Sequence, residues 1–305
     1  MKRDTIAAGE GPLVLVLGAR KGLLGQAAAK VFRDCGCRVA VQGREDTDPT
    51  SRESLQAMLQ RWRPDWLVNA MACTDDLAAE RDPDAAYALN AGLPRCLADM
   101  ARVNGMYLVH FSSALVFDGE KRAPYSPGDR AKPDCVLGAS KLAGERAIME
   151  SAPEASLIIR TSWLFGPWGG NFVRTLLERA RTERVLSVAH DAIGSPTYTL
   201  DLAHHAHKLM RQGATGIYHL SNSGRASWCE LAAEALAATE YNVKVEPVSS
   251  DRALKRAMRP SHHVLDISHS TRMMGQKPRP WPQALRDYMF SYEARHLWRD
   301  TVGAT

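Results

Sequence analysis

The sequence predicts an α/β protein with a doubly wound parallel sheet of the Rossmann type, followed by a smaller α+β portion. Two observations support this prediction. In the first half of the chain, apolar strand-like runs alternate with helical segments, which is the pattern of parallel βαβ units. In the second half, short strand-like pieces lie between helices without that rhythm. Ligands bind at the carboxyl ends of the strands in such sheets, and we expect the smaller portion to close over that edge.

The elements of the first half can be read in order. Residues 12–19, PLVLVLGA, form an apolar run typical of a strand buried on both faces. Residues 22–36 have helical spacing of apolar side chains and end at Gly36. Ser51 is expected to cap the next helix. The same patterns predict strands at 37–43, 65–72, 106–113 and 156–166, and helices at 51–62, 82–105 and 138–151.

The second half contains shorter elements. The patterns predict strand-like pieces at 217–220, 243–248 and 263–267, and helices at 227–238 and 281–296. We therefore expect a dinucleotide-binding domain at 12–165, with 190–222 returning to it. The substrate-binding portion is expected at 166–189 and 223–298, and disordered tails at 1–11 and 299–305.

The composition limits the classes of function. The 305 residues are 45% hydrophobic and 24% charged, as in ordinary soluble globular proteins. The net charge of +5 is small for this length and no basic run occurs, which argues against nucleic-acid binding. The apolar runs are too short to span a membrane. Six cysteines occur without a C-x-x-C pair, so we expect reduced thiols and a cytoplasmic protein.

A glycine-rich turn follows the first strand. Gly18, Gly22 and Gly25 lie in GARKGLLG, with the spacing G-x-x-x-G-x-x-G. Glycine permits a tight turn and a close approach of the backbone to a pyrophosphate. The first turn of the following helix contains Leu23 and Leu24. It would present free N–H groups and a partial positive charge to the phosphates. The turn therefore predicts a dinucleotide site.

The residues near this turn bear on the choice of dinucleotide. Arg44 follows the second strand, and Arg20 and Lys21 lie within the glycine loop. Cations at these positions suit the additional phosphate of NADP(H). Asp46 and Asp48 lie close enough to the end of the second strand to leave NAD(H) as the alternative, because a carboxylate there would bind the ribose hydroxyls.

Several segments together resemble one family. VLGASKLAGE (136–145) is similar to the active-site helix of short-chain dehydrogenases/reductases. FSSALVFDGEKRAPY, RTSWLFGPWGGNFVRTLL, DAIGSPTYTLDLAHHA and GIYHLSNSGRASWCELA follow in an order that resembles the dTDP-4-dehydrorhamnose reductase family, an extended branch of that superfamily. This resemblance implies reduction of the 4-keto group of a nucleotide-linked 6-deoxysugar by NAD(P)H.

The resemblance also assigns roles to residues. It implies a catalytic pair of Ser113 and Lys141, the latter also binding the nicotinamide ribose. The position of the catalytic tyrosine, four residues before the lysine, holds Leu137. The cofactor contacts would be Gly18, Arg20, Lys21, Gly22, Leu23, Leu24, Gly25, Arg44, Asn69, Ala70 and Lys141. The substrate contacts would be Trp163, Asn171 and Arg259.

Leu137 is one of several departures from the family pattern. Ala114 and Leu115 stand where the family has aspartate and tyrosine, and Ala192 replaces a glutamine. Reduction of a ketone leaves negative charge on the oxygen, and leucine has no proton to donate. The departures therefore predict a substrate pocket that is less polar than in the family, beside a cofactor site that is largely retained.

Two hypotheses follow. The chain is either an NADP(H)-dependent oxidoreductase with another proton donor, or a non-catalytic protein that binds NADP(H) and a nucleotide sugar and acts through a partner. The regulatory subunit of methionine adenosyltransferase has the second kind of role on this fold. A homodimer is compatible with both hypotheses. His204 and His207 share a helix face, but no third ligand is evident, so we expect no metal site.

Overall fold

A six-stranded parallel sheet forms the centre of the protein. The computed structural model describes residues 11–251 and 262–291. The central strands lie in the order β10-β5-β4-β3-β1-β2, and all neighbouring pairs are parallel. They are β1 (Leu13–Leu17), β2 (Arg38–Gln42), β3 (Trp66–Asn69), β4 (Tyr107–Ser113), β5 (Ser156–Thr161) and β10 (Gly216–His219). The predicted doubly wound sheet is confirmed.

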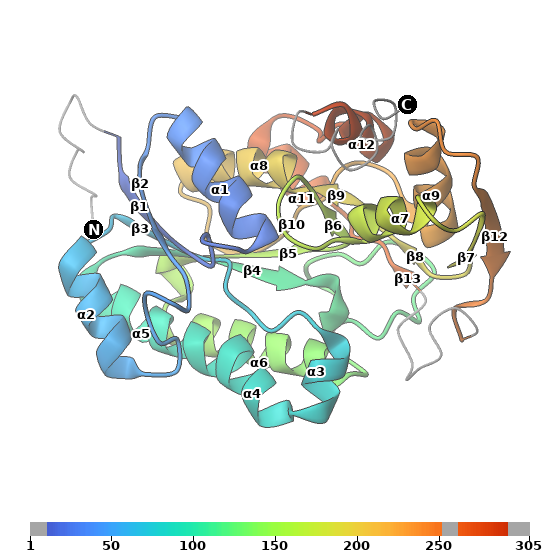
Figure 1. Cartoon of the computed structure of the whole chain (residues 1–305). Helices are drawn as coiled ribbons and strands as arrows, with labels where there is room; N and C mark the ends of the chain where they lie inside the picture. The colour runs from blue at the N-terminus through green and yellow to red at the C-terminus, as the bar shows by residue number, and fades with distance from the viewer. Residues whose placement is uncertain (1–10, 252–261, 292–305) are drawn as a thin grey trace.

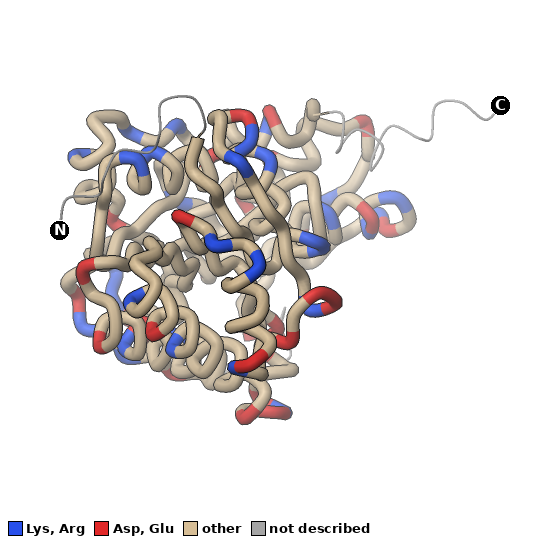
Figure 2. The backbone as a smooth tube through the Cα atoms, turned by 90° about the vertical axis from the view of Figure 1, so that its left-hand side faces the viewer, with Lys and Arg blue, Asp and Glu red and all other residues tan. Residues whose placement is uncertain are grey.

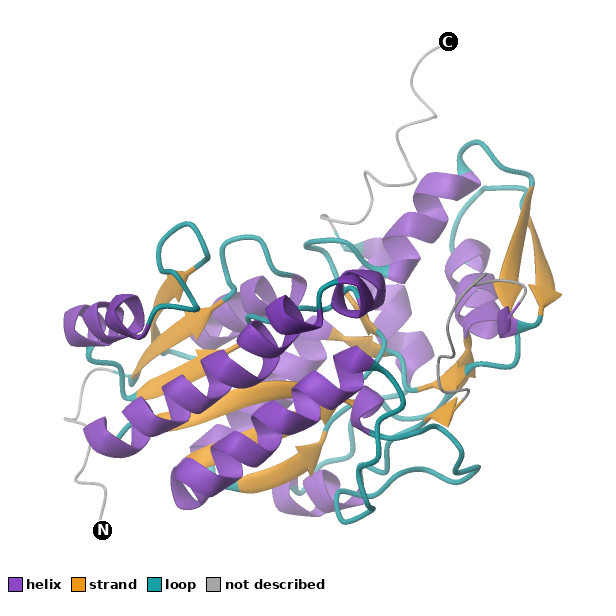
Figure 3. Ribbon diagram, turned by 90° about the horizontal axis from the view of Figure 1, so that it is seen from below, coloured by secondary structure: helices purple, strands orange, loops and turns teal. Residues whose placement is uncertain are grey.

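Helices cover both faces of this sheet. Figure 1 shows α1 and α8 above the strands and α2, α5 and α6 below them, and Figure 3 shows the lower helices from beneath. Val14 and Val16 of β1 belong to the upper core, whereas Leu15 and Leu17 belong to the lower one. An apolar run can thus fill both cores, because successive side chains point to opposite faces. The helices are α1 (Leu23–Asp34), α2 (Arg52–Trp62), α5 (Leu93–Asn104), α6 (Val136–Ser151) and α8 (Thr199–Arg211).

Helix α2 begins as expected, but the helix predicted at 82–105 is interrupted. Ser51 accepts a hydrogen bond from the Ser54 amide and caps α2. The long segment divides into a short helix and α5, separated by a π-helical turn that holds Asn90. The prediction of one regular helix was wrong because Asn90 turns inward and binds Cys73 and Ser140. The short helices before α5 are α3 (Asp76–Arg81) and α4 (Pro83–Tyr87).

The second portion lies beside the carboxyl edge of the sheet. Within the described ranges it is built from two strand pairs, a small three-stranded sheet and several helices. Figure 1 shows it at the right-hand side. These elements are β6 (Leu164–Phe165), β7 (Val185–Ala189), β8 (Ile193–Gly194), β9 (Thr197–Tyr198), β11 (Ala226–Ser227), β12 (Lys244–Val248), β13 (His262–His263), α7 (Phe172–Ala180), α9 (Trp228–Ala237) and α12 (Trp281–Phe290). A further helix, α11 (Ser268–Met274), packs on α8.

Two strands differ from expectation. The strand predicted at 156–166 breaks into β5 and β6, because Trp163 adopts a left-handed backbone with φ of 48°. The strand piece expected at 263–267 is reduced to β13. Arg259, and the tails apart from Gly11, fall outside the described residues.

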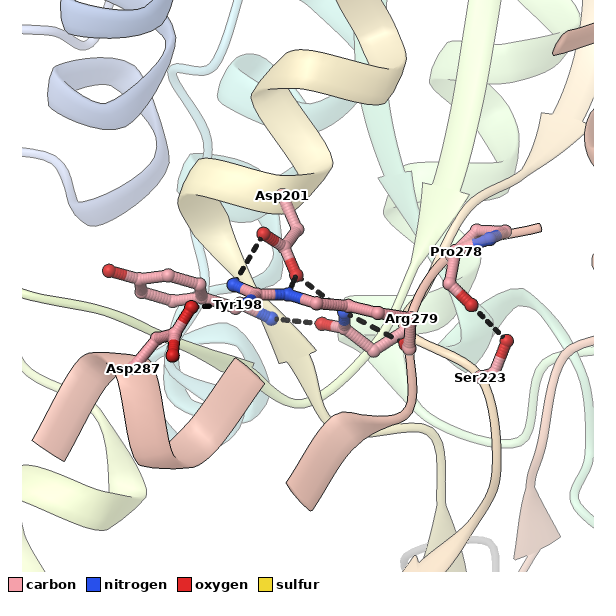
Figure 4. Close-up of polar contacts among 7 residues, drawn as sticks. Tyr198, Asp201, Ser223, Pro278, Arg279 and Asp287 are labelled. Atoms are coloured by element: carbon pink, nitrogen blue, oxygen red, sulfur yellow. Dashed lines mark hydrogen bonds and ion pairs between the residues drawn. The ribbon is translucent and has the colours of Figure 1, made fainter. Parts of the chain in front are cut away.

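A polar cluster connects the two portions (Figure 4). Arg279 donates two hydrogen bonds, of 2.7 and 2.9 Å, to the carboxylate of Asp201 in α8. The same guanidinium pairs with Asp287 of α12. Asn222 donates to Asp201 at 2.7 Å and accepts from the Tyr198 amide. A bidentate, partly buried pair of this kind fixes orientation as well as distance, so it holds α12 against α8.

The charged residues are distributed in a mixed pattern. In Figure 2, basic and acidic segments are interspersed along the backbone facing the viewer. Within 11–251 and 262–291, no helix has the length and apolar character that crossing a membrane requires.

A buried ion pair attaches α6 to the sheet. Arg160 of β5 donates to Glu145 of α6 at 2.6 and 2.9 Å, and the two side chains are only 4% and 2% exposed. The guanidinium also lies 5.0 Å from the centre of the Phe117 ring. Because both charges are desolvated, each depends on the other.

We predict that Glu145→Ala lowers the free energy of unfolding by about 3–5 kcal/mol, because it leaves the Arg160 charge buried without its partner. Urea denaturation measures the change. Glu178→Ala is the matched control, since Glu178 forms an exposed pair with Arg174 and is expected to cost under about 0.5 kcal/mol. Equal losses for the two variants would contradict the prediction.

Candidate functional site

The glycine loop is folded by close backbone contacts. Gly18 has a φ of 80°, and a Cβ there would collide with the carbonyl of Ala70. A Cβ on Gly22 or Gly25 would collide with the carbonyl of Gly18. The Gly18 amide donates to the Gln42 carbonyl at 2.8 Å, which fixes the loop on the end of β2. The three glycines are therefore required by contact as well as by conformation.

The N-terminus of α1 is open to an anion. Gly22 occupies the cap position and provides no side-chain hydrogen bond, and the first turn contains no acidic residue. The N–H groups of Leu23 and Leu24 therefore lack the side-chain acceptor that usually satisfies them. The loop at Gly169 approaches the Leu23 amide from the other side. A pyrophosphate fits this place, because it would satisfy these donors and the helix dipole.

The three basic residues near the loop are not equivalent. Arg20 forms a bidentate pair with Asp46 at 2.8 and 3.0 Å, which lowers the pKa of the Asp46 carboxyl. Lys21 lies 3.8 Å from Glu45. Arg44 makes only a 3.4 Å contact with the Ala72 carbonyl and has no acidic partner among the described residues. Arg44 is therefore the cation best placed to bind an additional phosphate.

A buried polar pair joins Asn69, the last residue of β3, to His110 in the middle of β4. The Asn69 side-chain oxygen accepts from the Met71 amide at 3.0 Å, so its NH₂ group faces His110, 3.1 Å away. The ring Nδ1 of His110 must then accept, which places the ring proton on Nε2. Burial and the charge of Lys141 lower the pKa of His110 to about 3, so the ring is neutral. Its Nε2 has no hydrogen-bond partner within the described part of the chain.

Lys141 points into the same region from α6. It is 6% exposed, and its ammonium has no hydrogen-bond or ion-pair partner among residues 11–251 and 262–291. Burial lowers its pKa from 10.5 to about 8, while the charges of Cys73 and Glu145 act in the opposite direction. A lysine in this state is a marker of a functional site.

Leu137 lies in an apolar cluster. It is 2% exposed and packs with Ala79 and Ala86, against partly buried Cys73 and Leu115. The tyrosine position is thus filled by a hydrocarbon side chain, and Leu115 adds to it. Ala114 and Ala192 are also buried, at 1% and 6% exposure.

Three other side chains with exchangeable protons, Ser113, Tyr125 and Cys135, form hydrogen bonds of their own. The Ser113 hydroxyl accepts from the Leu115 amide at 3.2 Å. The Tyr125 hydroxyl donates to Asp118 at 2.9 Å. Cys135 caps α6 by accepting from the Gly138 amide, and burial raises the pKa of its thiol.

Trp163 and Asn171, two of the predicted substrate contacts, are engaged with other parts of the protein. Trp163 stacks on Trp228 with ring centres 3.5 Å apart. Asn171 caps α7 by accepting from the Arg174 amide and donates to the Gly166 carbonyl.

His207 packs between Phe32 and Trp66, away from this site. Throughout the described ranges, no group of three or more potential ligands could hold a metal ion.

Sequence reasoning missed three residues of this site. Cys73, Asn90 and His110 meet near Lys141, although they come from three different segments. Asn90 could have been noticed, because asparagine is unfavourable inside a helix. His110 follows the fourth strand's apolar residues without a distinguishing pattern, and Cys73 belongs to no cysteine motif.

We predict that Lys141→Met stabilises the cofactor-free protein by about 3 kcal/mol at pH 7, because it removes a buried charge. The folded-state pKa of about 8 lies below the unfolded value, so the wild-type protein gains stability between pH 8 and 10.5 and the difference shrinks. Urea denaturation at pH 7 and pH 10 measures both effects. Lys21→Met is the exposed control, and an unchanged difference across this range would refute the argument.

Comparison with known proteins agrees with the family resemblance found in the sequence. The family model for the RmlD substrate binding domain matches residues 13–294. A dTDP-4-keto-6-deoxy-D-glucose reductase from Streptomyces niveus is 36% identical over 273 residues, covering 89% of this chain and 94% of that protein. A dTDP-4-dehydrorhamnose reductase from Streptomyces griseus is 35% identical over 283 residues, covering 90% and 92%. The solved structure of the Bacillus anthracis dTDP-4-dehydrorhamnose reductase, in complex with NADP, has a TM-score of 0.86 and 31% identity, covering 92% of this chain and 99% of that one.

Proposed function

Because the chain belongs to the RmlD substrate-binding-domain family of dTDP-4-dehydrorhamnose reductases, we propose that it is an NADP(H)-dependent reductase. The substrate would be the keto group of a nucleotide-linked deoxysugar or a related carbonyl compound. The main supporting observation is the uncapped N-terminus of α1 above the glycine loop, at the same sheet edge as the buried Lys141. The Bacillus anthracis relative with NADP bound supports the choice of cofactor.

Each residue of the site has a proposed task. The amides of Leu23 and Leu24 bind the pyrophosphate, and Arg44 binds the additional phosphate of NADP(H). The reduced nicotinamide supplies the hydride when it is bound. Lys141 binds the nicotinamide ribose and stabilises negative charge that develops on the substrate oxygen. Ser113 orients the carbonyl group.

Leu137 supports a second candidate function. A buried leucine cannot protonate an alkoxide, and the loss of a general acid costs about 10²- to 10⁴-fold in rate. The alternative is a protein that binds NADP(H) and a nucleotide sugar and acts through a partner. Both candidates require the cofactor site.

Two measurements test these candidates. Fluorescence titration should detect NADPH binding, and no binding of either NADPH or NADH would refute both. Oxidation of NADPH in the presence of a dTDP-4-keto-6-deoxysugar distinguishes them, since only the reductase consumes the cofactor. Binding without turnover would favour the partner protein.

We predict that Arg44→Ala weakens NADPH binding roughly 10-fold or more, because a charge-assisted hydrogen bond to phosphate is lost. NADH lacks that phosphate, so its affinity should change by about twofold at most. Parallel titrations with the two cofactors measure the effect. Arg33→Ala, at the far end of α1, is the control. An equal loss for NADPH and NADH would show that Arg44 does not recognise the phosphate.

A further inference from the structure

A thiol lies beside the position of the missing tyrosine. Cys73 follows β3 by four residues, at the carboxyl edge of the sheet. Its side chain is partly buried and packs against the apolar cluster that contains Leu137. Its Sγ makes a long contact, of 3.9 Å, with the Asp75 carbonyl oxygen.

The backbone of Cys73 is held in place. Asn90 accepts from the Cys73 amide at 2.9 Å and donates to its carbonyl at 3.2 Å. The Asn90 amide also donates to the Ser140 hydroxyl, one residue before Lys141, at 2.9 Å. Ser140 in turn donates to the Leu137 carbonyl. This chain of bonds keeps the Cys73 loop in a fixed position relative to α6, independently of the thiol.

Two unsatisfied polar groups lie around this position. Asn90 bonds to both Cys73 and Ser140, the residue before Lys141, and burial and the charge of Lys141 lower the pKa of His110, so Lys141 lies near the loop after β3 and near β4. Lys141 is 6% exposed and His110 is 2% exposed. Neither the ammonium nor the His110 Nε2 has a hydrogen-bond partner in the described part of the chain. Burying these groups without partners lowers the stability of the folded protein, unless a ligand or a reacting group forms hydrogen bonds with them.

We propose that Cys73, paired with Lys141, is the proton donor of this site in place of the tyrosine. The proposal rests on the reductase function proposed above. Once a hydride has reached the carbonyl carbon, the oxygen is an alkoxide. The Cys73 S–H bond breaks and an O–H bond forms on the substrate. The thiolate that remains is stabilised by the Lys141 ammonium and takes a proton from water before the next turnover.

The chemistry of a thiol suits this step. A thiol has an ordinary pKa near 8.5, so it is mostly protonated at pH 7 and is a stronger acid than the phenol it would replace. The hydroxyls of Ser113 and Tyr125 are weaker acids, and Cys135 serves as a helix cap. By contrast, Cys73 packs against the cluster that contains Leu137, and its thiol is not used as a helix cap.

The first test does not depend on turnover. Iodoacetamide alkylation of each cysteine is followed by mass spectrometry in the wild-type protein and in Lys141→Met. Loss of the ammonium is expected to slow alkylation of Cys73 several-fold, because a nearby positive charge stabilises the reactive thiolate. Exposed Cys35, in the same digest, is the internal reference and should not change. Equal rates at Cys73 in the two proteins would overturn the pairing.

The second test measures NADPH oxidation with a dTDP-4-keto-6-deoxysugar. Cys73→Ser keeps the shape of the side chain but removes the acidic thiol, and should lower kcat by roughly 10²- to 10⁴-fold with little change in NADPH affinity. Cys35→Ala should retain wild-type activity. Adding Leu137→Tyr to Cys73→Ser should restore part of the lost rate.

The outcomes are distinguishable. Turnover by Cys73→Ser at the wild-type rate would overturn the proposed donor while leaving the reductase function intact. No turnover by the wild-type protein, with NADPH bound, would overturn the reductase function and, with it, the proton-donor role. In that case the alkylation result still decides whether Cys73 and Lys141 form a pair.

Discussion

The site depends on the buried ion pair that attaches α6 to the sheet. Arg160 and Glu145 are almost completely buried, and their charges can stay there only if each remains in contact with the other. Lys141 lies one helical turn before Glu145, so the pair also determines where the lysine is held. Gly138 and Gly144 let the same helix approach the carbonyls of Leu115 and Asn90, where a Cβ would collide. Contacts other than those of Leu137 therefore help to hold α6 in position.

These contacts explain how the backbone around the site can keep its position although hydrocarbon side chains replace polar ones. The glycine loop, the uncapped start of α1 and Lys141 are maintained by backbone contacts and by the ion pair. Leu115 and Leu137 replace side chains that are expected to face a substrate. They pack together with Ala79 and Ala86, and this packing leaves no polar side-chain group of theirs without a hydrogen bond. A packed cluster of hydrocarbon side chains therefore occupies the position where the family has a tyrosine.

The sequence predicted the sheet well, because apolar runs such as Leu13–Leu17 have only one good environment, between two layers of helices. It predicted the glycine loop for a similar local reason. The break at Trp163 and the π-helical turn at Asn90 could not be predicted, because each depends on a partner far along the chain, Trp228 in one case and Cys73 in the other. The bond between Arg279 and Asp201 is of the same kind, since 78 residues separate its two ends.

The burial of Lys141 is an argument that the site binds a ligand. A methionine would fill much the same volume without placing an unpaired charge in the interior, so packing gives no reason for a lysine there. Burial lowers the pKa of this ammonium, because the charged form loses its contact with water. A bound ribose or a developing negative charge on a substrate would compensate it, whereas an empty site would not. Both candidate functions therefore require the lysine, and they differ only in whether a proton donor stands beside it.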